Sequence, residues 1–253
     1  MKALFTSSVM AFSMFSVIPT PRVEWSKENM RYMLACLPLV GLVIVAVLWL
    51  WLQLCEWLSF GNFLFAAGLT LLPLFVSGGI HFDGFCDTVD ALSSHASPER
   101  KREILKDSRA GAFAVIFAAG YLLLYAAIAS EVERTNAAVL CVGIHHVFAR
   151  VIGALASAAL KTSAEKGTLA MFHDAAQKRT FVVLLVWAAI CAAVLIWLSP
   201  VSGAVSVVLS ALCFLYIRCM SSRQFGGMSG DLAGYLITLA EIVLLLGLFF
   251  RKG

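Results

Sequence analysis

The sequence predicts an all-α protein, a single membrane-embedded domain over residues 1–253 built as a bundle of about seven transmembrane helices. Of its 253 residues, 61% are hydrophobic and only 13% are charged, whereas a soluble domain carries about 25% charged residues. The apolar residues also form runs long enough to cross a bilayer core, which takes about 20 helical residues. A net charge of +4 is small, so we expect the lipid bilayer, and no nucleic acid, as a partner.

The chain opens on a short apolar run, residues 3–18, that follows Lys2. Serines interrupt this run, and it ends at Pro19-Thr20-Pro21 without a small-residue cleavage site. These features favour a short interfacial or re-entrant helix over a cleaved signal peptide.

Seven longer segments are predicted as transmembrane helices, because only a helix satisfies its own backbone hydrogen bonds within the bilayer. Between the fifth and sixth segments, Ser199-Pro200 predicts a tight hairpin. The segments are Leu34–Leu52, Phe63–Ile80, Ala112–Ser130, Ala137–Leu160, Phe181–Leu198, Val201–Met220 and Leu232–Phe250.

Lysines and arginines are concentrated on one side of these segments. The positive-inside rule therefore places the N-terminus and the loops after the second, fourth and sixth spans in the cytoplasm. Arg134, Arg251 and Lys252 are the contrary charges. The cations that support the assignment are Arg22, Lys27, Arg31, Arg100, Lys101, Arg102, Lys106, Arg109, Lys161, Lys166, Lys178, Arg179 and Arg223.

Three aspartates follow the second span at positions that share one face of a helix. Asp83, Asp87 and Asp90 are spaced i, i+4, i+7. Carboxylates held so close repel one another unless a cation lies between them. Mg²⁺ prefers such oxygen ligands and keeps sites free for waters or substrate phosphates. The alternative is that the aspartates only solvate a helix end at the membrane surface.

Other groups in the same loop fit phosphate chemistry. His81 is a candidate general base or phosphate contact, or simply an interfacial histidine. Ser97-Pro98-Glu99 predicts the start of a short helix. Beyond it, Lys106 and Arg109 are natural partners for phosphate oxygens, although positive-inside topology also explains cations there. Asp107 stands beside Arg109, just ahead of a glycine.

A glycine-rich turn, Phe225–Asp231, opens the last span. Glycines let backbone N–H groups approach an anion, and the start of a helix favours negative charge. Asp231 is expected either to cap that helix or to supply another metal ligand.

Two ionisable residues fall inside predicted spans. Arg150 lies in the fourth span near His145 and His146, and Glu241 lies in the seventh. Because ionisable groups at such depth are costly, they face a partner or a water-filled cavity. A structural Arg150–Glu241 pair and a substrate-lining role are both open.

Taken together, these motifs resemble the cobalamin synthase family, the adenosylcobinamide-GDP ribazoletransferases, over nearly the whole chain. Val17 departs from the family pattern, which usually has arginine there, and Ser229 stands where threonine is common. The segments that carry the resemblance are Ile18–Pro21, Gly79–Asp90, Asp107–Gly111, Gly226–Asp231 and Glu241.

The resemblance implies an enzyme of the bacterial cytoplasmic membrane that joins adenosylcobinamide-GDP and α-ribazole, or α-ribazole 5′-phosphate. The products would be adenosylcobalamin, or its 5′-phosphate, and GMP, with Mg²⁺ required. A homo-oligomer, or assembly with other late enzymes of the cobalamin pathway, is left open.

The resemblance also assigns roles to residues. His81 would be the base, and Lys106 and Arg109 would neutralise developing charge. The metal would be held by Asp83, Asp87, Asp90 and Asp231. Substrate contacts are expected from Thr88, Asp107, Ser108, Gly111, Arg150, Gly226, Gly227, Ser229, Gly230 and Glu241.

Two other functions are alternatives. A transporter would bind its substrate near the membrane midplane, often within repeated halves, but no internal repeat is evident. A CDP-alcohol phosphotransferase also gathers aspartates at a membrane helix end. Its run of Asp-Gly followed by Ala-Arg is absent here, because Asp83-Gly84 continues to Phe85-Cys86-Asp87.

Overall fold

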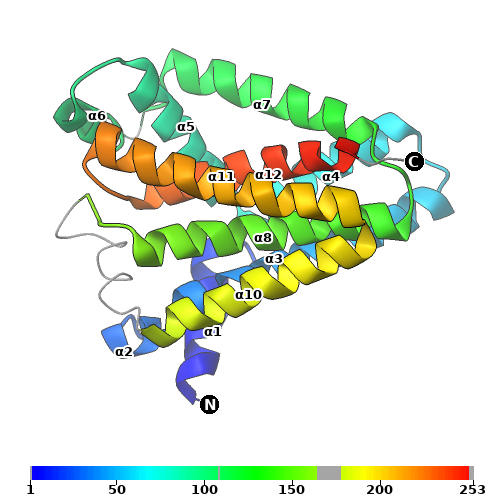
Figure 1. The fold of residues 1–253 in the computed structure, drawn as a ribbon, viewed down its shortest axis with the longest axis horizontal. Coiled ribbons are helices and arrows are strands. Elements are labelled where there is room, and N and C mark those ends of the chain that lie inside the picture. The colour runs from blue at the N-terminus through cyan, green and yellow to red at the C-terminus, as the bar shows by residue number, and fades with distance from the viewer. Residues whose placement is uncertain (1, 108, 164–177, 251–253) are drawn as a thin grey trace.

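In the computed structural model, which describes residues 2–107, 109–163 and 178–250, the chain is helical and contains no β-sheet within those ranges. Figure 1 shows the long helices lying side by side. The elements are α1 (Lys2–Phe15), α2 (Lys27–Met30), α3 (Met33–Trp57), α4 (Asn62–Ser77), α5 (Ile80–Ser93), α6 (Pro98–Ile104), α7 (Ala112–Ser130), α8 (Asn136–Ala159), α10 (Lys178–Leu198), α11 (Pro200–Phe225), α12 (Gly230–Leu246) and the 3-10 turn η1 (Gly247–Phe250).

Six helices of the described chain are long and apolar enough to cross a membrane, namely α3, α7, α8, α10, α11 and α12 continued by η1. Counting the bent pair α4 and α5 as one crossing gives seven. The predicted fold class, a polytopic helical membrane protein, is therefore confirmed.

The bend between α4 and α5 is the main departure from the predicted spans. The second span was predicted to run to Ile80, but α4 ends at Ser77 and the chain turns by 96° before α5 begins. Gly78 (φ 63°) and Gly79 (φ 75°) both adopt the left-handed conformation that glycine favours. This break redirects α5, which carries the aspartates, across the end of α12.

Several predicted boundaries match the structure. The helix predicted over Ala112–Ser130 is α7. Ser199 precedes α11 with Pro200 as its first residue, which forms the expected hairpin. The Ser97 hydroxyl accepts a hydrogen bond from the Arg100 N–H and caps α6. The N-terminal helix α1 is also present, and it leaves the bundle at a steep angle to the long helices (Figure 1).

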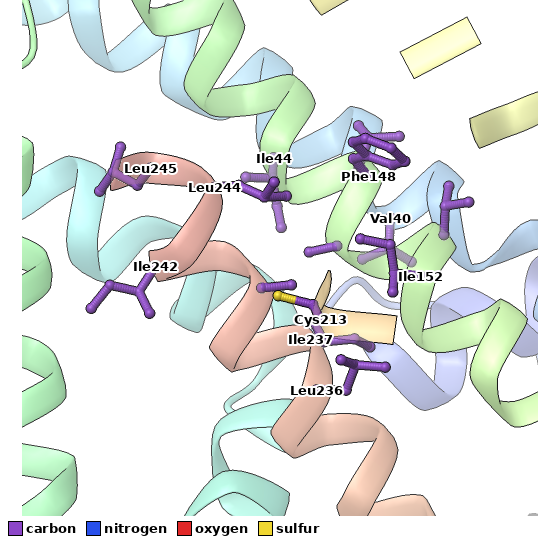
Figure 2. Packing of buried hydrophobic residues seen from close by; sticks show 14 of the residues in the cluster. Val40, Ile44, Phe148, Ile152, Cys213, Leu236, Ile237, Ile242, Leu244 and Leu245 are labelled. Atoms are coloured by element: carbon purple, nitrogen blue, oxygen red, sulfur yellow. The ribbon is translucent and has the colours of Figure 1, made fainter. Parts of the chain in front are cut away.

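Helix α8 is the centre of the bundle, and most of its side chains are buried against α3, α10 and α12. Figure 2 shows Val40 and Ile44 of α3 facing Phe148 and Ile152 of α8. Glycines let the two helices approach closely, as is usual where membrane helices pack. A Cβ atom at Gly41 would lie 2.7 Å from the Val147 Cα.

The outer helices present apolar side chains to their surroundings. Ile116 and Leu123 of α7 are 62% and 74% exposed, and Val186 of α10 is 53% exposed. A soluble protein rarely exposes so much contiguous apolar surface, which agrees with a surface that contacts lipid.

The α3–α8 contact yields a stability prediction. Gly41→Ala should lower the unfolding free energy by about 1–3 kcal/mol, the usual cost of overpacking a core, because its new methyl group meets the Val147 backbone. Gly120→Ala in α7 is the matched control, since nothing lies within 4 Å of a Cβ atom there. Thermal unfolding in detergent measures both, and equal melting temperatures for the two variants would contradict the tight α3–α8 contact.

Candidate active site

The two predicted motif regions meet because α5 and α12 touch backbone to backbone. A Cβ atom at Gly84 would lie 2.7 Å from the Asp231 carbonyl oxygen, and one at Gly234 would lie 2.8 Å from the His81 carbonyl oxygen. Only glycine permits such an approach at both points. The contact brings Asp231 to the face of α5 that carries Asp83 and Asp87.

Four aspartates lie near this contact, and three of them, Asp83, Asp87 and Asp90, belong to α5 at the spacing noted in the sequence. Asp83 is exposed, whereas Asp87, Asp90 and Asp231 are half-buried. The charges of Asp83, Asp231 and Asp90 all repel that of Asp87. In the described part of the chain, Asp83, Asp87 and Asp231 form no ion pair with any Lys, Arg or His. The cluster therefore has an uncompensated negative charge, which favours a cation there.

Asp90 has a structural role that its spacing did not predict. Its Oδ2 accepts a hydrogen bond from the Gly111 N–H (2.6 Å), and its Oδ1 accepts one from the Ala114 N–H (2.8 Å). These N–H groups are at the start of α7, where helix donors lack partners within the helix. The approach at Gly111 is close, because a Cβ atom there would lie 2.7 Å from the Asp90 carboxylate and would push it aside. Asp90 thus caps α7, and its metal-binding role stays a prediction.

A cavity of about 210 Å³ lies between α1, α3, α5, α8 and α12. His81, Asp83 and Asp231 line it, together with apolar residues such as Phe15 and Leu34. The His81 ring stacks on Phe15 with 5.7 Å between centroids. Its Nε2 is buried and has no hydrogen-bond partner among the described residues. An unpartnered buried nitrogen is costly, which favours a bound group that completes it.

The predicted cations lie outside this cavity. Lys106 and Arg109 are exposed. The Arg109 guanidinium donates to Asp107 twice, from Nε (3.0 Å) and Nη2 (2.8 Å). These bonds lower the pKa of Asp107 to about 2, so the pair persists through mildly acidic pH and is lost only as the pH falls through that value. Contacts of Lys106, Asp107 and Arg109 with substrate stay predictions, and Ser108 lies outside the described residues.

Thr88 is fully buried, and its hydroxyl has no partner in the described chain. The hydroxyl faces packed protein, so substrate contact at Thr88 stays a prediction without support from its surroundings.

The glycine-rich turn serves mainly to close one helix and start the next. Gly226 ends α11 with a φ of 72°, and the N–H groups of Gly226 and Gly227 both reach the Ser221 carbonyl. A Cβ atom at Gly227 would meet the Lys161 carbonyl at 2.7 Å. The N–H groups expected to bind an anion are thus engaged within the fold, and a substrate role for Gly226 and Gly227 stays a prediction.

The structure also separates the two roles considered for Asp231. Ser229 caps α12, since its hydroxyl accepts a hydrogen bond from the Leu232 N–H (3.2 Å). Gly230 is the first residue of that helix. Because Ser229 provides the cap, the Asp231 carboxylate is left for the acidic cluster. Direct substrate contacts of Ser229 and Gly230 stay predictions.

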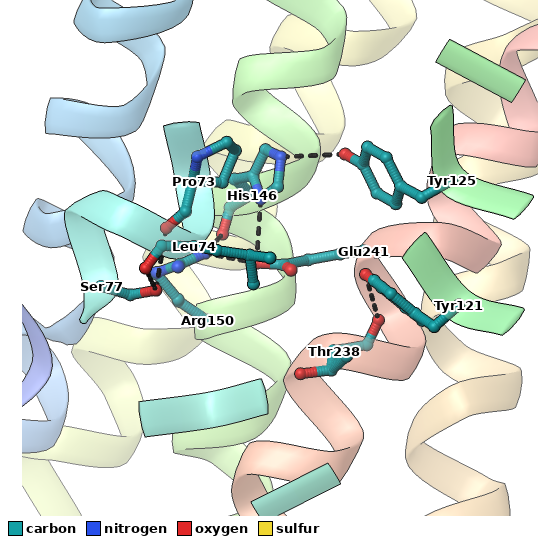
Figure 3. A network of polar contacts seen from close by, with 9 residues as sticks. All are labelled: Pro73, Leu74, Ser77, Tyr121, Tyr125, His146, Arg150, Thr238 and Glu241. Carbon is teal, nitrogen blue, oxygen red and sulfur yellow. Dashed lines mark hydrogen bonds and ion pairs between the residues drawn. The ribbon is translucent and has the colours of Figure 1, made fainter. Parts of the chain in front are cut away.

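Of the two roles left open for Arg150 and Glu241, the structure contains the ion pair, with 2.8 Å between Nη1 and Oε1 and both side chains buried. Figure 3 shows how the pair extends into a network. His146 Nδ1 lies 2.9 Å from the same Glu241 oxygen, and Tyr125 Oη lies 3.1 Å from His146 Nε2. Gly153 and Ile237, each about one helical turn from Arg150 and Glu241, line the cavity, so the pair lies beside it. A direct substrate contact by Arg150 or Glu241 stays a prediction.

Sequence reasoning missed His146 and Tyr125 as members of this network. The signal for His146 was present, because it precedes Arg150 by four residues and therefore shares its helix face. Nothing in the sequence pointed to Tyr125, which comes from another helix.

Fold and site together define a multi-pass membrane protein with a carboxylate-rich cavity at one end of the bundle and a paired charge network beneath it. The model of the cobalamin-5-phosphate synthase family matches residues 7–249, and the chain belongs to this family. No solved structure matches the chain.

Relatives cover nearly the full length. An adenosylcobinamide-GDP ribazoletransferase of Lachnoclostridium phytofermentans is 38% identical over 96% of this chain and 93% of the relative. One from Clostridium botulinum is 31% identical over 98% of each chain. One from Geobacillus thermodenitrificans is 32% identical over 96% of this chain and 95% of the relative. The predicted family and enzyme class, a transferase of cobalamin biosynthesis, are confirmed.

The position of Val17 bears on the departure from the family pattern. The Val17 N–H donates to the Val76 carbonyl (3.0 Å), and a Cβ atom at Gly78 would lie 3.0 Å from the Val17 side chain. Residue 17 therefore lies at the helix break that leads into the acidic motif.

The charge network predicts a large effect of removing one partner. Glu241→Leu should destabilise the protein by about 3–5 kcal/mol, because it leaves Arg150 buried and unpaired. Adding Arg150→Met should recover most of that loss. The exposed Glu103, paired with Arg100 on α6, supplies the control Glu103→Gln, which should change stability by less than about 0.5 kcal/mol. Denaturation in detergent measures all three, and a Glu241→Leu variant as stable as the control would contradict the pairing.

Proposed function

We propose that the chain joins adenosylcobinamide-GDP to α-ribazole, or to α-ribazole 5′-phosphate, at the acidic cavity. A hydroxyl oxygen of the ribazole ribose forms a bond to the phosphorus nearest cobinamide. The bond from that phosphorus to GMP breaks, and the hydroxyl proton passes to the protein. The observation that carries the proposal is the meeting of Asp83 and Asp231 with His81 around one cavity, with Asp87 close enough to be repelled by both aspartates. The names of the relatives support the substrates.

The residues at this cavity fit Mg²⁺. Among the described residues, no three His, Cys, Asp or Glu side chains are arranged around a metal position. Mg²⁺ needs fewer, because it is commonly held by one or two carboxylates, substrate phosphates and water. Asp83 and Asp231 of the cavity, and Asp87 near them, supply hard oxygen donors that form no ion pair with a cation in the described part of the chain. When bound, Mg²⁺ would neutralise charge on the diphosphate during transfer.

His81 is positioned to accept the proton. Its unpartnered Nε2 belongs to a residue that lines the same cavity as Asp83 and Asp231. Burial disfavours the protonated form of an imidazole, so the ring is neutral before the reaction and its unpartnered nitrogen has a lone pair to receive the proton. Stacking on Phe15 holds the ring in place.

Lys106 and Arg109 would bind the outgoing phosphates from outside the cavity. Arg109 already binds a carboxylate through two parallel hydrogen bonds, and a phosphate offers the same geometry. Substrate would therefore displace Asp107 from Arg109.

The reaction is proposed to take place on the cytoplasmic side. The end of the bundle that carries Asp83 and Asp231 also carries the basic helix α6 and Lys161, and cytoplasmic loops are enriched in such cations. The transporter alternative gains no support, because Arg150 and Glu241 bind each other instead of lining an open polar site at mid-depth.

The first test measures GMP release by membranes that contain the protein, given adenosylcobinamide-GDP, α-ribazole and Mg²⁺. Asp83→Asn and Asp87→Asn should each lower the rate at least about 100-fold, the scale expected for losing a group that stabilises transition-state charge. Glu103→Gln is the matched control and should be active. Near-full activity in both aspartate variants would disprove the metal assignment, and corrinoid transport without GMP release would favour the transporter.

The second test concerns the base. His81→Gln should lower kcat about 10²- to 10⁴-fold, as expected for loss of general base catalysis, with KM changed much less. Phe15→Leu removes the stacked ring but keeps the imidazole, and should affect kcat far less. If His81→Gln retained kcat within a factor of two of the original, the histidine would be structural.

A further inference from the structure

A second and larger cavity, of about 820 Å³, lies on the other side of the glycine-rich turn. The end of α8, the last turns of α11 and the Gly226-Gly227 pair enclose it. None of the chemistry proposed above uses it. Its lining divides into a basic part and an apolar part.

The basic part consists of Lys161, Arg218 and Arg223. All three are exposed, and within the described residues none of them forms an ion pair. Among the residues that the structure describes, no acidic one lines the cavity. Three unneutralised cations around one hollow select an anion, and arginine side chains favour the oxygens of phosphate.

The apolar part continues along the outer face of α11. Leu215 lines the cavity. Together with Val208 and Leu212 it forms an apolar stripe at spacing i, i+4, i+7. Val208 is 59% exposed, Leu212 54% and Leu215 56%. Arg218 follows Leu215 by one helical turn. The stripe therefore leads from the lipid-facing surface directly to the cations.

We infer that this cavity binds an anionic phospholipid. The headgroup phosphate lies among Lys161, Arg218 and Arg223, and an acyl chain follows the stripe of Val208, Leu212 and Leu215. Basic pockets between membrane helices at the cytoplasmic side suit such headgroups. A soluble phosphate ester shares the phosphate but has nothing to cover the apolar stripe.

This site adjoins the acidic one. Gly226 and Gly227 line the lipid cavity, and the same turn runs on to Asp231. A bound headgroup would therefore contact the turn that positions Asp231. Lipid binding itself does not depend on the proposed reaction.

The inference is tested on the purified full chain by native mass spectrometry, after delipidation and titration with phosphatidylglycerol or phosphatidylcholine. The original chain should bind phosphatidylglycerol more tightly. Arg218→Gln and Arg223→Gln should each weaken that binding about fivefold, and the double variant about 25-fold, the effect of about one cation each near an anionic headgroup. Arg100→Gln, an exposed cation on α6 at the same end of the bundle, is the control and should leave binding unchanged.

Three results would overturn the inference. The first is equal affinity of the original chain for the two lipids. The second is unchanged phosphatidylglycerol binding by the double variant while its thermal unfolding matches that of the original chain. The third is binding of glycerol phosphate or GMP as tight as that of phosphatidylglycerol, which would assign the cavity to a soluble phosphate ester. Neither measurement uses the transferase reaction, so this inference and the proposed function fail separately.

Discussion

The candidate site depends on the close contact between the backbones of α5 and α12. Gly84 and Gly234 each lie where a Cβ atom would meet the other helix within 3 Å, so the two helices could not come this close with larger residues. The contact places Asp231 beside Asp83 and Asp87, and it places His81 over the same cavity. The left-handed Gly78 and Gly79 make the approach available, because they turn α5 away from the direction of α4.

Beneath this contact, the protein must hold ionisable groups inside an apolar bundle. It does so by matching Arg150 with Glu241 and by adding His146 and Tyr125 as further partners. Partner groups of this kind reduce the cost of burying charge, although an apolar replacement of both partners is often as stable. The network therefore fixes how α8 and α12 sit against each other, and the cavity forms at that junction.

Sequence patterns predicted the helices well, because a bilayer demands long apolar segments and leaves few alternatives. Both predicted ends of α7 agree with the structure. Helix α3, in contrast, continues past the predicted end at Leu52 to Trp57, because the polar residues Gln53 and Glu56 do not stop a helix. The Asp83–Asp87–Asp231 cluster also followed from spacing and motif. The capping role of Asp90 could not be predicted from its spacing, because a carboxylate that caps another helix and one that binds a metal can have the same spacing in a sequence. The exposure of Arg109 and its pairing with Asp107 depend on the loop's conformation, which no local pattern determines.

The Asp90 carboxylate links helix α5 to the start of helix α7. One carboxylate belongs to the acidic helix α5 and also holds the first N–H groups of α7, a helix that is largely exposed along its length. A displacement of α5 must therefore move the start of α7 or break two hydrogen bonds. The two helices are thus coupled through one side chain, and a shift in the position of α5 is passed on to the first turn of α7.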